Sequence, residues 1–243
     1  MQPGVQSDPS GFETLETFSG AHAFNSWLYD QIKEYTQGQI LEIGSGIGNI
    51  SSFLLKEQQS VSLSDLRPEY CQLLKNKFRD QPGLQRIIEM DLSLTGFREM
   101  YTEYLEKFDT VIALNVIEHI ADDSLAILNA KSLLRKNGKM IILVPAGQWL
   151  YNQLDKELGH YKRYTMSGLN EILKSAGLHI FRSKYFNAAA IFGWWLSGKI
   201  LKDKMISTSK LHFYNRLVPL FKVMDWFVKP FTGISVISVG VKK

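Results

Sequence analysis

The chain has 243 residues, of which 45% are hydrophobic and 21% charged, and its formal net charge is +4. This composition is typical of a folded globular protein and excludes a mainly disordered chain. The length suffices for one large α/β domain. The charge is unevenly distributed, because no Lys or Arg precedes Lys33 whereas nine lie within 199–243. This asymmetry concerns binding partners more than the fold.

The N-terminal part of the chain divides into two stretches. Residues 1–11 are rich in Pro, Gly, Ser and Asp and predict a mobile leader. In 12–35, apolar residues such as Trp27 and Ile32 recur at helical spacing, which predicts one or two helices. These helices either pack on the edge of a sheet or form a lid over a ligand, and the sequence leaves both interpretations open.

The segment 40–49 reads as an apolar strand followed by a glycine turn and the start of a helix near Asn49 or Ser51. A dinucleotide-binding turn has the pattern G-x-G-x-x-G, and Asn49 stands at its third glycine position. An acidic residue, Glu42, precedes the first glycine. We expect it to face a cationic group of a ligand better than a phosphate.

Two further strands are predicted to end in acidic residues. The strand 61–65 ends in Asp65, at a spacing where doubly wound folds place a carboxylate for ribose hydroxyls. The strand near 86–90 is followed by Asp91 and Leu92. With Glu42, these residues predict an acidic carboxyl edge of the sheet, which suits a positively charged ligand. The alternative for Asp65 is that it only caps a helix.

The next segments predict two more strands with a helix between them. The nearly unbroken apolar run 108–114 is typical of a strand buried on both faces, and it leads into Asn115 and the pair Glu118-His119. A helix to about residue 135 and a fifth strand at 139–144 follow. His119 could accept a proton near neutral pH, although a histidine at a helix start can also be purely structural.

The pattern E-x-G-x-G-x-G resembles motif I of the class I S-adenosylmethionine-dependent methyltransferases. The resemblance implies an α/β fold with a doubly wound, seven-stranded, mostly parallel sheet and a helical insertion before the last strand. It implies that Asp65 binds the ribose, that Asp91 binds the adenine amino group and that Leu92 packs on the adenine ring. The residues implied to bind S-adenosylmethionine are Glu42, Gly44, Ser45, Gly46, Gly48, Asp65, Leu66, Asp91, Leu92 and Asn115.

A second motif lies in 158–165, where the run L-G-H-Y-K-R-Y gathers a histidine, two tyrosines and two cations. It resembles a motif on the substrate side of a group of bacterial methyltransferases that are often encoded near glycosyltransferases. Arg163 and Lys162 could hold a phosphate or carboxylate, and His160 or Tyr161 could orient a hydroxyl. The alternative is a loop held by stacked aromatic residues with a surface arginine.

The C-terminal part is predicted to contain a strand at 179–185 and a final strand at 234–241, separated by a long insertion. Aromatic residues alternate with Lys and Arg in this insertion, which is typical of an element that lies in a membrane interface. Its apolar run is too short to span a bilayer. Packing on the sheet or across a homodimer interface is the alternative.

We therefore interpret the chain as a single methyltransferase domain, 1–243. Its parts are a leader with lid helices (1–37), a cofactor-binding core (38–186), a helical insertion (187–232) and the final strand (233–243). The expected reaction is methyl transfer from S-adenosylmethionine to an oxygen or nitrogen of a small-molecule, sugar or lipid-linked acceptor. His119, His160, Tyr161 and Arg163 are expected to position or deprotonate that acceptor.

Several expectations about partners and alternatives complete this interpretation. We find no pattern for a metal site and no nucleic-acid-binding motif. No secretory signal is visible, so we expect a cytoplasmic protein, with membrane contact at the inner face through 187–232 as a further possibility. A non-catalytic scaffold of the same fold and a nucleotide-dependent oxidoreductase are the alternatives.

Overall fold

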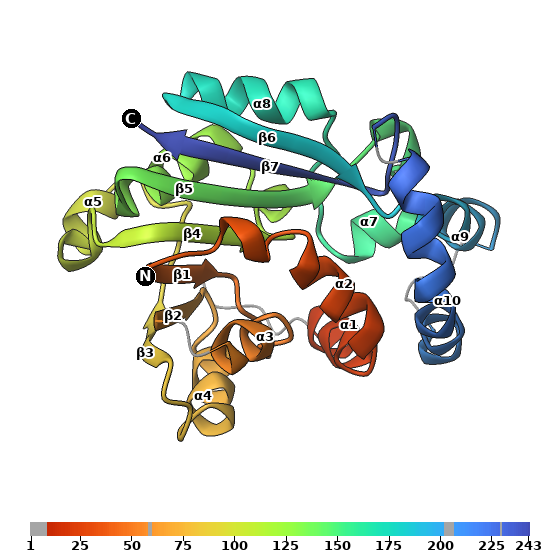
Figure 1. Cartoon of the computed structure of the whole chain (residues 1–243), viewed down its shortest axis with the longest axis horizontal. Coiled ribbons are helices and arrows are strands. Elements are labelled where there is room, and N and C mark those ends of the chain that lie inside the picture. The colour runs from red at the N-terminus through yellow and green to blue at the C-terminus, as the bar shows by residue number, and fades with distance from the viewer. Residues whose placement is uncertain (1–8, 58–59, 202–206, 229) are drawn as a thin grey trace.

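The computed structural model describes residues 9–57, 60–201, 207–228 and 230–243. Seven strands form one sheet in the order β3-β2-β1-β4-β5-β7-β6 (Figure 1). The strands β1 to β5 are parallel, and β7 runs antiparallel to both of its neighbours. The strands are β1 (Gln39–Ile43), β2 (Ser60–Asp65), β3 (Leu84–Glu89), β4 (Phe108–Leu114), β5 (Leu134–Pro145), β6 (Leu178–Phe186) and β7 (Ser235–Lys242). This arrangement confirms the predicted fold class.

The helices lie at the positions where the sequence predicts them, with two exceptions. The helices are α1 (Pro9–Ser19), α2 (His22–Asp30), α3 (Ser51–Lys56), α4 (Pro68–Lys77), α5 (Phe97–Met100), α6 (Asp123–Leu133), α7 (Gln153–Glu157), α8 (Met166–Ser175), α9 (Ala190–Trp195) and α10 (Thr208–Val228). The short α7 was not predicted. The sequence predicts one helix over about 97–106, whereas the structure has α5 followed by a separate 3₁₀ turn, Thr102–Tyr104. The predicted leader comprises residues 1–11, and residues 1–8 of it lie outside the described residues.

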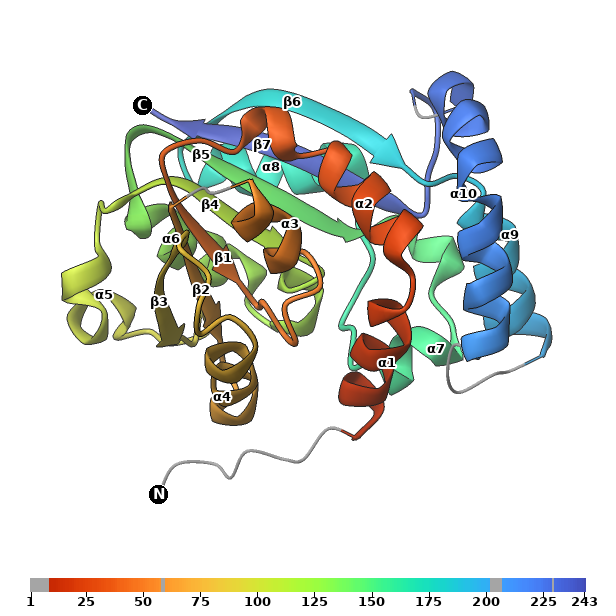
Figure 2. The ribbon, with the colours of Figure 1, turned by 60° about the horizontal axis from the view of Figure 1, so that its bottom comes forward.

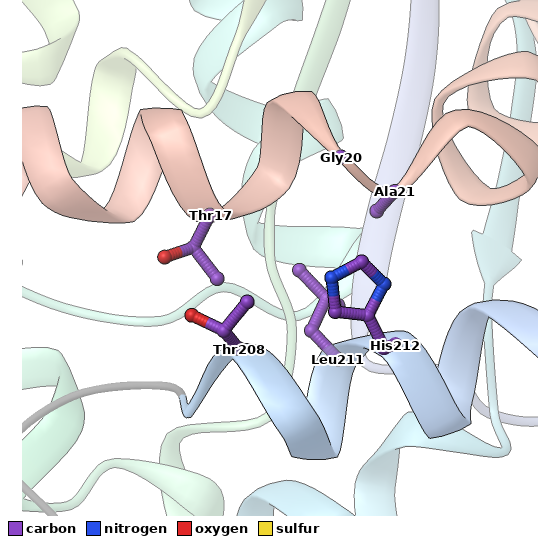
Figure 3. A pocket seen from close by; sticks show the side chains of 6 residues that line it. All are labelled: Thr17, Gly20, Ala21, Thr208, Leu211 and His212. Carbon is purple, nitrogen blue, oxygen red and sulfur yellow. The ribbon is translucent and has the colours of Figure 1, made fainter.

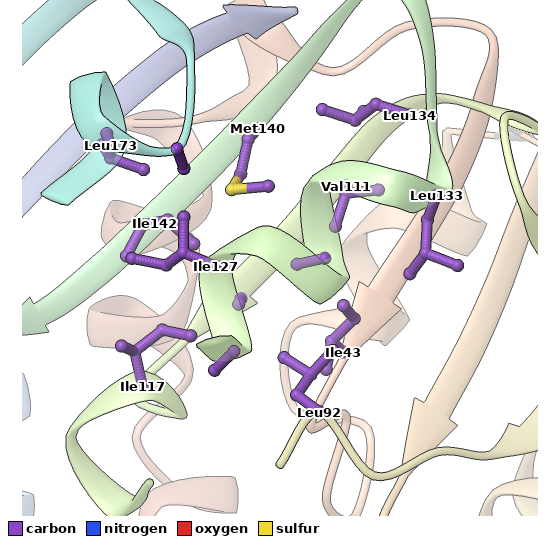
Figure 4. Packing of buried hydrophobic residues seen from close by; sticks show 14 of the residues in the cluster. Ile43, Leu92, Val111, Ile117, Ile127, Leu133, Leu134, Met140, Ile142 and Leu173 are labelled. Atoms are coloured by element: carbon purple, nitrogen blue, oxygen red, sulfur yellow. The ribbon is translucent and has the colours of Figure 1, made fainter. Parts of the chain in front are cut away.

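The two faces of the sheet bury separate hydrophobic clusters, because successive side chains of a strand point to opposite faces. On β5, Met140 and Ile142 contribute to the cluster under α6 and α8, whereas Ile141 and Leu143 contribute to the cluster under α2 and α3. Figure 4 shows the first cluster, with Ile127 of α6 beside Ile142. The central strands are therefore covered on both sides, as their apolar sequences predict.

The parallel strands end at one edge of the sheet, and α1, α7, α9 and α10 gather at that end (Figures 1 and 2). In α2, which follows α1 along the chain, Trp27 and Leu28 are buried. Ile32, just beyond the end of α2, is also buried. This burial confirms the packing interpretation for α2. The lid interpretation can therefore apply only to α1.

The insertion between β6 and β7 is anchored at its base by α10. The Tyr214 hydroxyl donates a hydrogen bond to the Asn187 side chain, and Asp225 accepts one from the backbone amide of Ala188, at 2.8 Å. The helix buries Leu211 and Val218 on the same side as Asp225. Within the described residues, none of the helices combines the length and apolar character needed to cross a bilayer. Lys202, Lys204 and Lys229, which contribute to the expected basic character of the insertion, lie outside the described residues.

Candidate functional site

The glycine turn after β1 requires glycine at three positions. Gly44, Gly46 and Gly48 have φ values of 68°, 54° and 79°, which non-glycine residues seldom adopt. A Cβ atom at Gly44 would also collide with Val116, and one at Gly48 would collide with the Phe78 ring. The backbone amide of Ser45 donates to the Ser64 carbonyl of β2 at 2.9 Å, which fixes the turn at the sheet edge.

The Glu42 side chain points beneath this turn rather than outward. It is buried and accepts a hydrogen bond from the Ser51 hydroxyl at the start of α3. Burial raises the pKa of the Glu42 carboxyl to about 7, while the hydrogen bond from Ser51 acts in the opposite direction. Glu42 therefore braces the turn through its hydrogen bond with Ser51. Its contact with a cationic group of a ligand stays a prediction.

Asp65 connects the end of β2 to the glycine turn. Its Oδ2 accepts a hydrogen bond from the Gly46 amide at 2.9 Å, and its Oδ1 accepts one from the Arg67 amide at 3.0 Å. Burial raises the pKa of Asp65. A carboxylate has about four lone-pair directions, so the group retains capacity to accept ligand hydroxyls. Leu66, which follows it, is 53% exposed and is available for contact with an apolar ring face.

The residues after β3 have two different environments. Asp91 is half-buried, and its Oδ1 accepts hydrogen bonds from the backbone and the hydroxyl of Ser93. Leu92 lies in the hydrophobic core next to Ile43 (Figure 4). Because the Leu92 side chain is buried, the structure gives it a packing role, and its contact with an adenine ring stays a prediction.

Asn115 directly follows β4 and has a left-handed backbone conformation, with a φ of 54°. Its side chain is exposed. Its backbone amide donates to the Leu143 carbonyl of β5 at 2.9 Å, so the bend is held at the edge of the sheet. The bend directs the chain into the 3₁₀ turn Ile117–His119. The predicted cofactor residues Gly46, Asp65 and Asn115 thus lie along one edge.

Helix α1 covers this edge. The Asn49 side chain donates to the Leu15 carbonyl at 3.0 Å, and Phe12 stacks on Tyr70 of α4 with ring centroids 6.2 Å apart. A Cβ at Gly46 would lie 2.9 Å from the Leu15 side chain. The Leu15 side chain of α1 therefore lies in the space that the missing Cβ of Gly46 leaves open.

A cluster of titratable side chains follows β4 along the same edge. Glu118, His119 and His160 each offer a nitrogen or oxygen atom, and these atoms lie within 4.8 Å of one another. The two imidazole rings meet edge to face, with centroids 4.8 Å apart. Glu118 is completely buried, which raises its pKa to about 8. The backbone amide of Tyr161 donates to the Glu118 carbonyl at 2.8 Å and joins the two segments.

Sequence reasoning missed Asp155, which organises the second segment. Asp155 is buried on α7, and its Oδ1 lies 2.8 Å from both His160 Nδ1 and Arg163 Nε. Its Oδ2 accepts a hydrogen bond from the Asn152 amide at 3.0 Å. Burial alone would raise the pKa of Asp155, but the His160 hydrogen bond and the Arg163 charge hold it below its ordinary value. The capping residue Asn152 is the one signal in the sequence for this helix.

The expected anion-binding role of Arg163 and Lys162 is corrected by these contacts. The Arg163 guanidinium is buried, pairs with Asp155, donates to the Ala146 carbonyl and lies 4.6 Å from the centre of the Trp194 ring. The Lys162 ammonium pairs with Asp123 at 2.6 Å. Both cations are neutralised by carboxylates of the chain itself. Arg163 therefore positions Asp155, whereas Tyr161, at 63% exposure, remains open to a ligand.

A separate crevice lies between α1, α2 and α10 and is lined by six residues, which include Thr17, Thr208 and His212 (Figure 3). It has no interior space large enough for a water molecule. Ligand pockets typically enclose roughly 300–1,000 Å³, so this crevice is too small for a substrate. The residues predicted to form the functional site lie at the edge described above and not in this crevice.

Comparison with known proteins identifies relatives of the chain. Residues 41–140 match a family model described as a methyltransferase domain. A curated relative named ubiquinone biosynthesis O-methyltransferase, from Xanthomonas euvesicatoria, is 23% identical over 175 residues, which cover 65% of this chain and 71% of the relative. The protein of the same name from Xylella fastidiosa is also 23% identical, with 65% of this chain and 69% of the relative covered.

Solved structures share the fold across nearly the whole chain. A methyltransferase from Thermotoga maritima, described as a possible histamine N-methyltransferase, superposes with a TM-score of 0.64 at 14% identity, covering 95% of this chain and 96% of the other. Phosphoethanolamine N-methyltransferase 2 from Haemonchus contortus, in complex with S-adenosyl-L-methionine, has a TM-score of 0.60 at 18% identity. That alignment covers 98% of this chain and 60% of the other.

The Asp155 network generates a stability prediction. Replacing Asp155→Asn leaves Arg163 buried without its anion, so we expect the free energy of unfolding to fall by roughly 3–5 kcal/mol. The double variant Asp155→Asn/Arg163→Met should lose less than the sum of the single losses, because the two side chains form one pair. Urea denaturation measures all three variants.

The matched control is Glu103→Gln, which breaks the exposed Arg86–Glu103 ion pair and should leave stability unchanged. Additive losses in the double variant, or an Asp155→Asn variant as stable as the wild type, would contradict the assigned role of Asp155.

Proposed function

Because the chain is a class I S-adenosylmethionine-dependent methyltransferase, we propose that it methylates a hydroxyl oxygen of a small-molecule acceptor. The observation that carries the proposal is the cluster of His119 and His160 beside Asn115, at the edge of the sheet where the cofactor residues end. Two curated relatives are named as O-methyltransferases, which supports an oxygen acceptor.

The cofactor half of the site is proposed to consist of the glycine turn, Asp65, Leu66 and Asn115. When bound, S-adenosylmethionine supplies a methyl group on a positively charged sulfur, open to in-line attack by a nucleophile. The fit is supported by the Asp65 carboxylate, which has lone pairs left for ribose hydroxyls, and by the exposed Leu66 side chain. Leu15 occupies space above Gly46, so we propose that α1 is the lid and shifts when the site fills.

The acceptor half is proposed to consist of His119, His160 and Tyr161. His160 Nδ1–H donates a hydrogen bond to the Asp155 carboxylate. The Nε2 lone pair of His160 is then available for an acceptor hydroxyl. His119 is exposed at the rim and can pass a proton to solvent. The acceptor oxygen would lose its proton to an imidazole as it forms its bond to the methyl carbon. The bond between that carbon and the cofactor sulfur would break at the same time, and its electron pair would stay on the sulfur of the departing thioether. Arg163 contributes only by holding Asp155 in place.

The proposal gives specific kinetic expectations. Methyl transfer is measured with radiolabelled S-adenosylmethionine and a panel of phenolic and sugar hydroxyl acceptors. His160→Asn should lower kcat/KM by about 10²–10⁴, the usual contribution of a positioned acid–base group. The KM for S-adenosylmethionine should not change, because His160 lies outside the cofactor half.

His179→Asn is the matched control, since His179 is exposed on β6 far from the cluster in the fold, and it should behave as wild type. Equal rates for His160→Asn and wild type would rule out the acceptor role. No transfer to any acceptor in the panel would favour the non-catalytic scaffold.

We further propose that α10 places the enzyme on a membrane surface, where an amphiphilic acceptor would reside. The outward side of α10 carries an apolar stripe of Phe213, Leu220, Val223 and Phe227, each more than half exposed and spaced at helical intervals. Arg216 lies within this stripe. Exposed aromatic side chains beside basic ones are typical of helices that lie in a lipid interface.

Sedimentation with vesicles of phosphatidylglycerol tests this contact. Wild type is expected to sediment with them, and Phe213→Ser/Phe227→Ser should reduce partitioning at least tenfold, because burying each ring contributes about 1.5–3 kcal/mol. Met100→Ser, which removes an exposed apolar side chain on α5, is the control. Absence of wild-type binding, or a dimer in solution that buries the stripe, would contradict the proposal.

A further inference from the structure

Glu118 is a carboxyl group for which the described structure provides no partner. The residue has an exposed fraction of 0%, and neither carboxyl oxygen has a hydrogen-bond partner among the described residues. Burying a polar group without a partner is costly, and such groups are rare in folded proteins. The other buried carboxylates of this region are satisfied, because Asp155 and Asp123 accept several hydrogen bonds or ion pairs. Glu118 is therefore a buried group whose oxygens are left for a ligand to satisfy.

Two imidazoles stand next to this carboxyl group. The ligand atoms of Glu118, His119 and His160 lie within 4.8 Å of one another. The Asp155 carboxylate, 2.8 Å from His160 Nδ1, fixes the ring so that Nε2 presents its lone pair. A carboxylate behind a histidine is the usual arrangement for a metal-ligating imidazole, because it orients the ring and increases its basicity.

We propose that Glu118, His119 and His160 bind one divalent transition-metal ion, with Asp155 orienting His160. Two imidazole nitrogens and one carboxylate oxygen form a ligand set that suits Zn²⁺ or Fe²⁺ and leaves coordination positions open. Ligand atoms at about 2.0–2.2 Å from such an ion lie roughly 3–3.5 Å apart, so small side-chain rotations complete the site. The all-oxygen preference of Mg²⁺ makes that ion a poor fit.

The open coordination positions face the acceptor side of the enzyme. His119 is exposed, and the cluster follows Asn115 along the edge where the acceptor is proposed to bind. A metal ion there would take up the His160 Nε2 lone pair, and it would replace His160 as the group that activates the acceptor, by holding the acceptor oxygen and lowering the pKa of its hydroxyl. This role of the ion rests on the proposed function, whereas ion binding itself does not. The sequence shows no pattern for a metal site, and the proposed site departs from that expectation at these three residues.

Titration of the chelator-treated full-length protein with Co²⁺ tests the site, because Co²⁺ bound by imidazole and carboxylate ligands absorbs visible light. Wild type is expected to bind one ion per chain, and an equimolar amount of Cu²⁺ should displace it, as the Irving–Williams order predicts. Glu118→Gln and His160→Asn should each weaken Co²⁺ binding at least tenfold. His179→Asn should bind as wild type does.

His119→Asn keeps the test decisive if the Glu118 variant fails to fold, because His119 is exposed and its replacement leaves the core intact. No stoichiometric Co²⁺ binding by wild type, or equal binding by wild type and His119→Asn, would overturn the site. Methyl transfer that persists at full rate in the chelator-treated enzyme would overturn only the acceptor role of the ion. Metal binding without any methyl transfer would count against the proposed function and leave the site standing.

Discussion

The buried carboxylate of Asp155 is the interaction on which the acceptor side of this protein depends. It accepts hydrogen bonds from His160, Arg163 and the Asn152 backbone while being fully removed from solvent. An unpaired carboxylate in that position would be strongly destabilising, so the three donors and Asp155 must occur together. The loop 158–165 is thereby fixed to α7, and His160 is held in one orientation toward His119.

The active edge is assembled from segments that are distant in the sequence but end at the same side of a parallel sheet. The turns after β1, β2 and β4 supply the residues proposed to bind the cofactor, and the segments after β4 and β5 supply the residues proposed to bind the acceptor. This division follows from the crossover connections, which return each strand in the same direction and bring the carboxyl ends together. The hydrogen bond from the Tyr161 amide to the Glu118 carbonyl joins the acceptor segments.

The sequence predicted those parts of the molecule that depend on local patterns. Apolar strands and the glycine turn with its positive φ values follow from residue type and spacing. The seven-stranded sheet follows from the resemblance to the methyltransferase family, and the order of its strands is seen only in the structure. The exposed Asn115 and the buried Asp65 both lie at the edge where their positions in the sequence place them.

The sequence could not predict which way individual polar side chains point. Glu42 turns inward because Ser51 offers a hydroxyl beneath the turn, and Arg163 is buried because Asp155 and Trp194 enclose it. These partners come from separate elements, so no periodicity reveals them. The cluster of Glu118 with His160 was missed for the same reason, since only the fold brings the two loops together.

The central claim is that the glycine turn and Asp65 hold S-adenosylmethionine independently of the acceptor cluster. Calorimetric titration with S-adenosylmethionine tests it most directly. Wild type should bind one molecule per chain, His160→Asn should bind equally well, and Asp65→Ala should bind at least tenfold more weakly, because a charge-assisted hydrogen bond contributes about 1.5–3 kcal/mol. Undiminished binding by Asp65→Ala, or no saturable binding by wild type, would contradict the account.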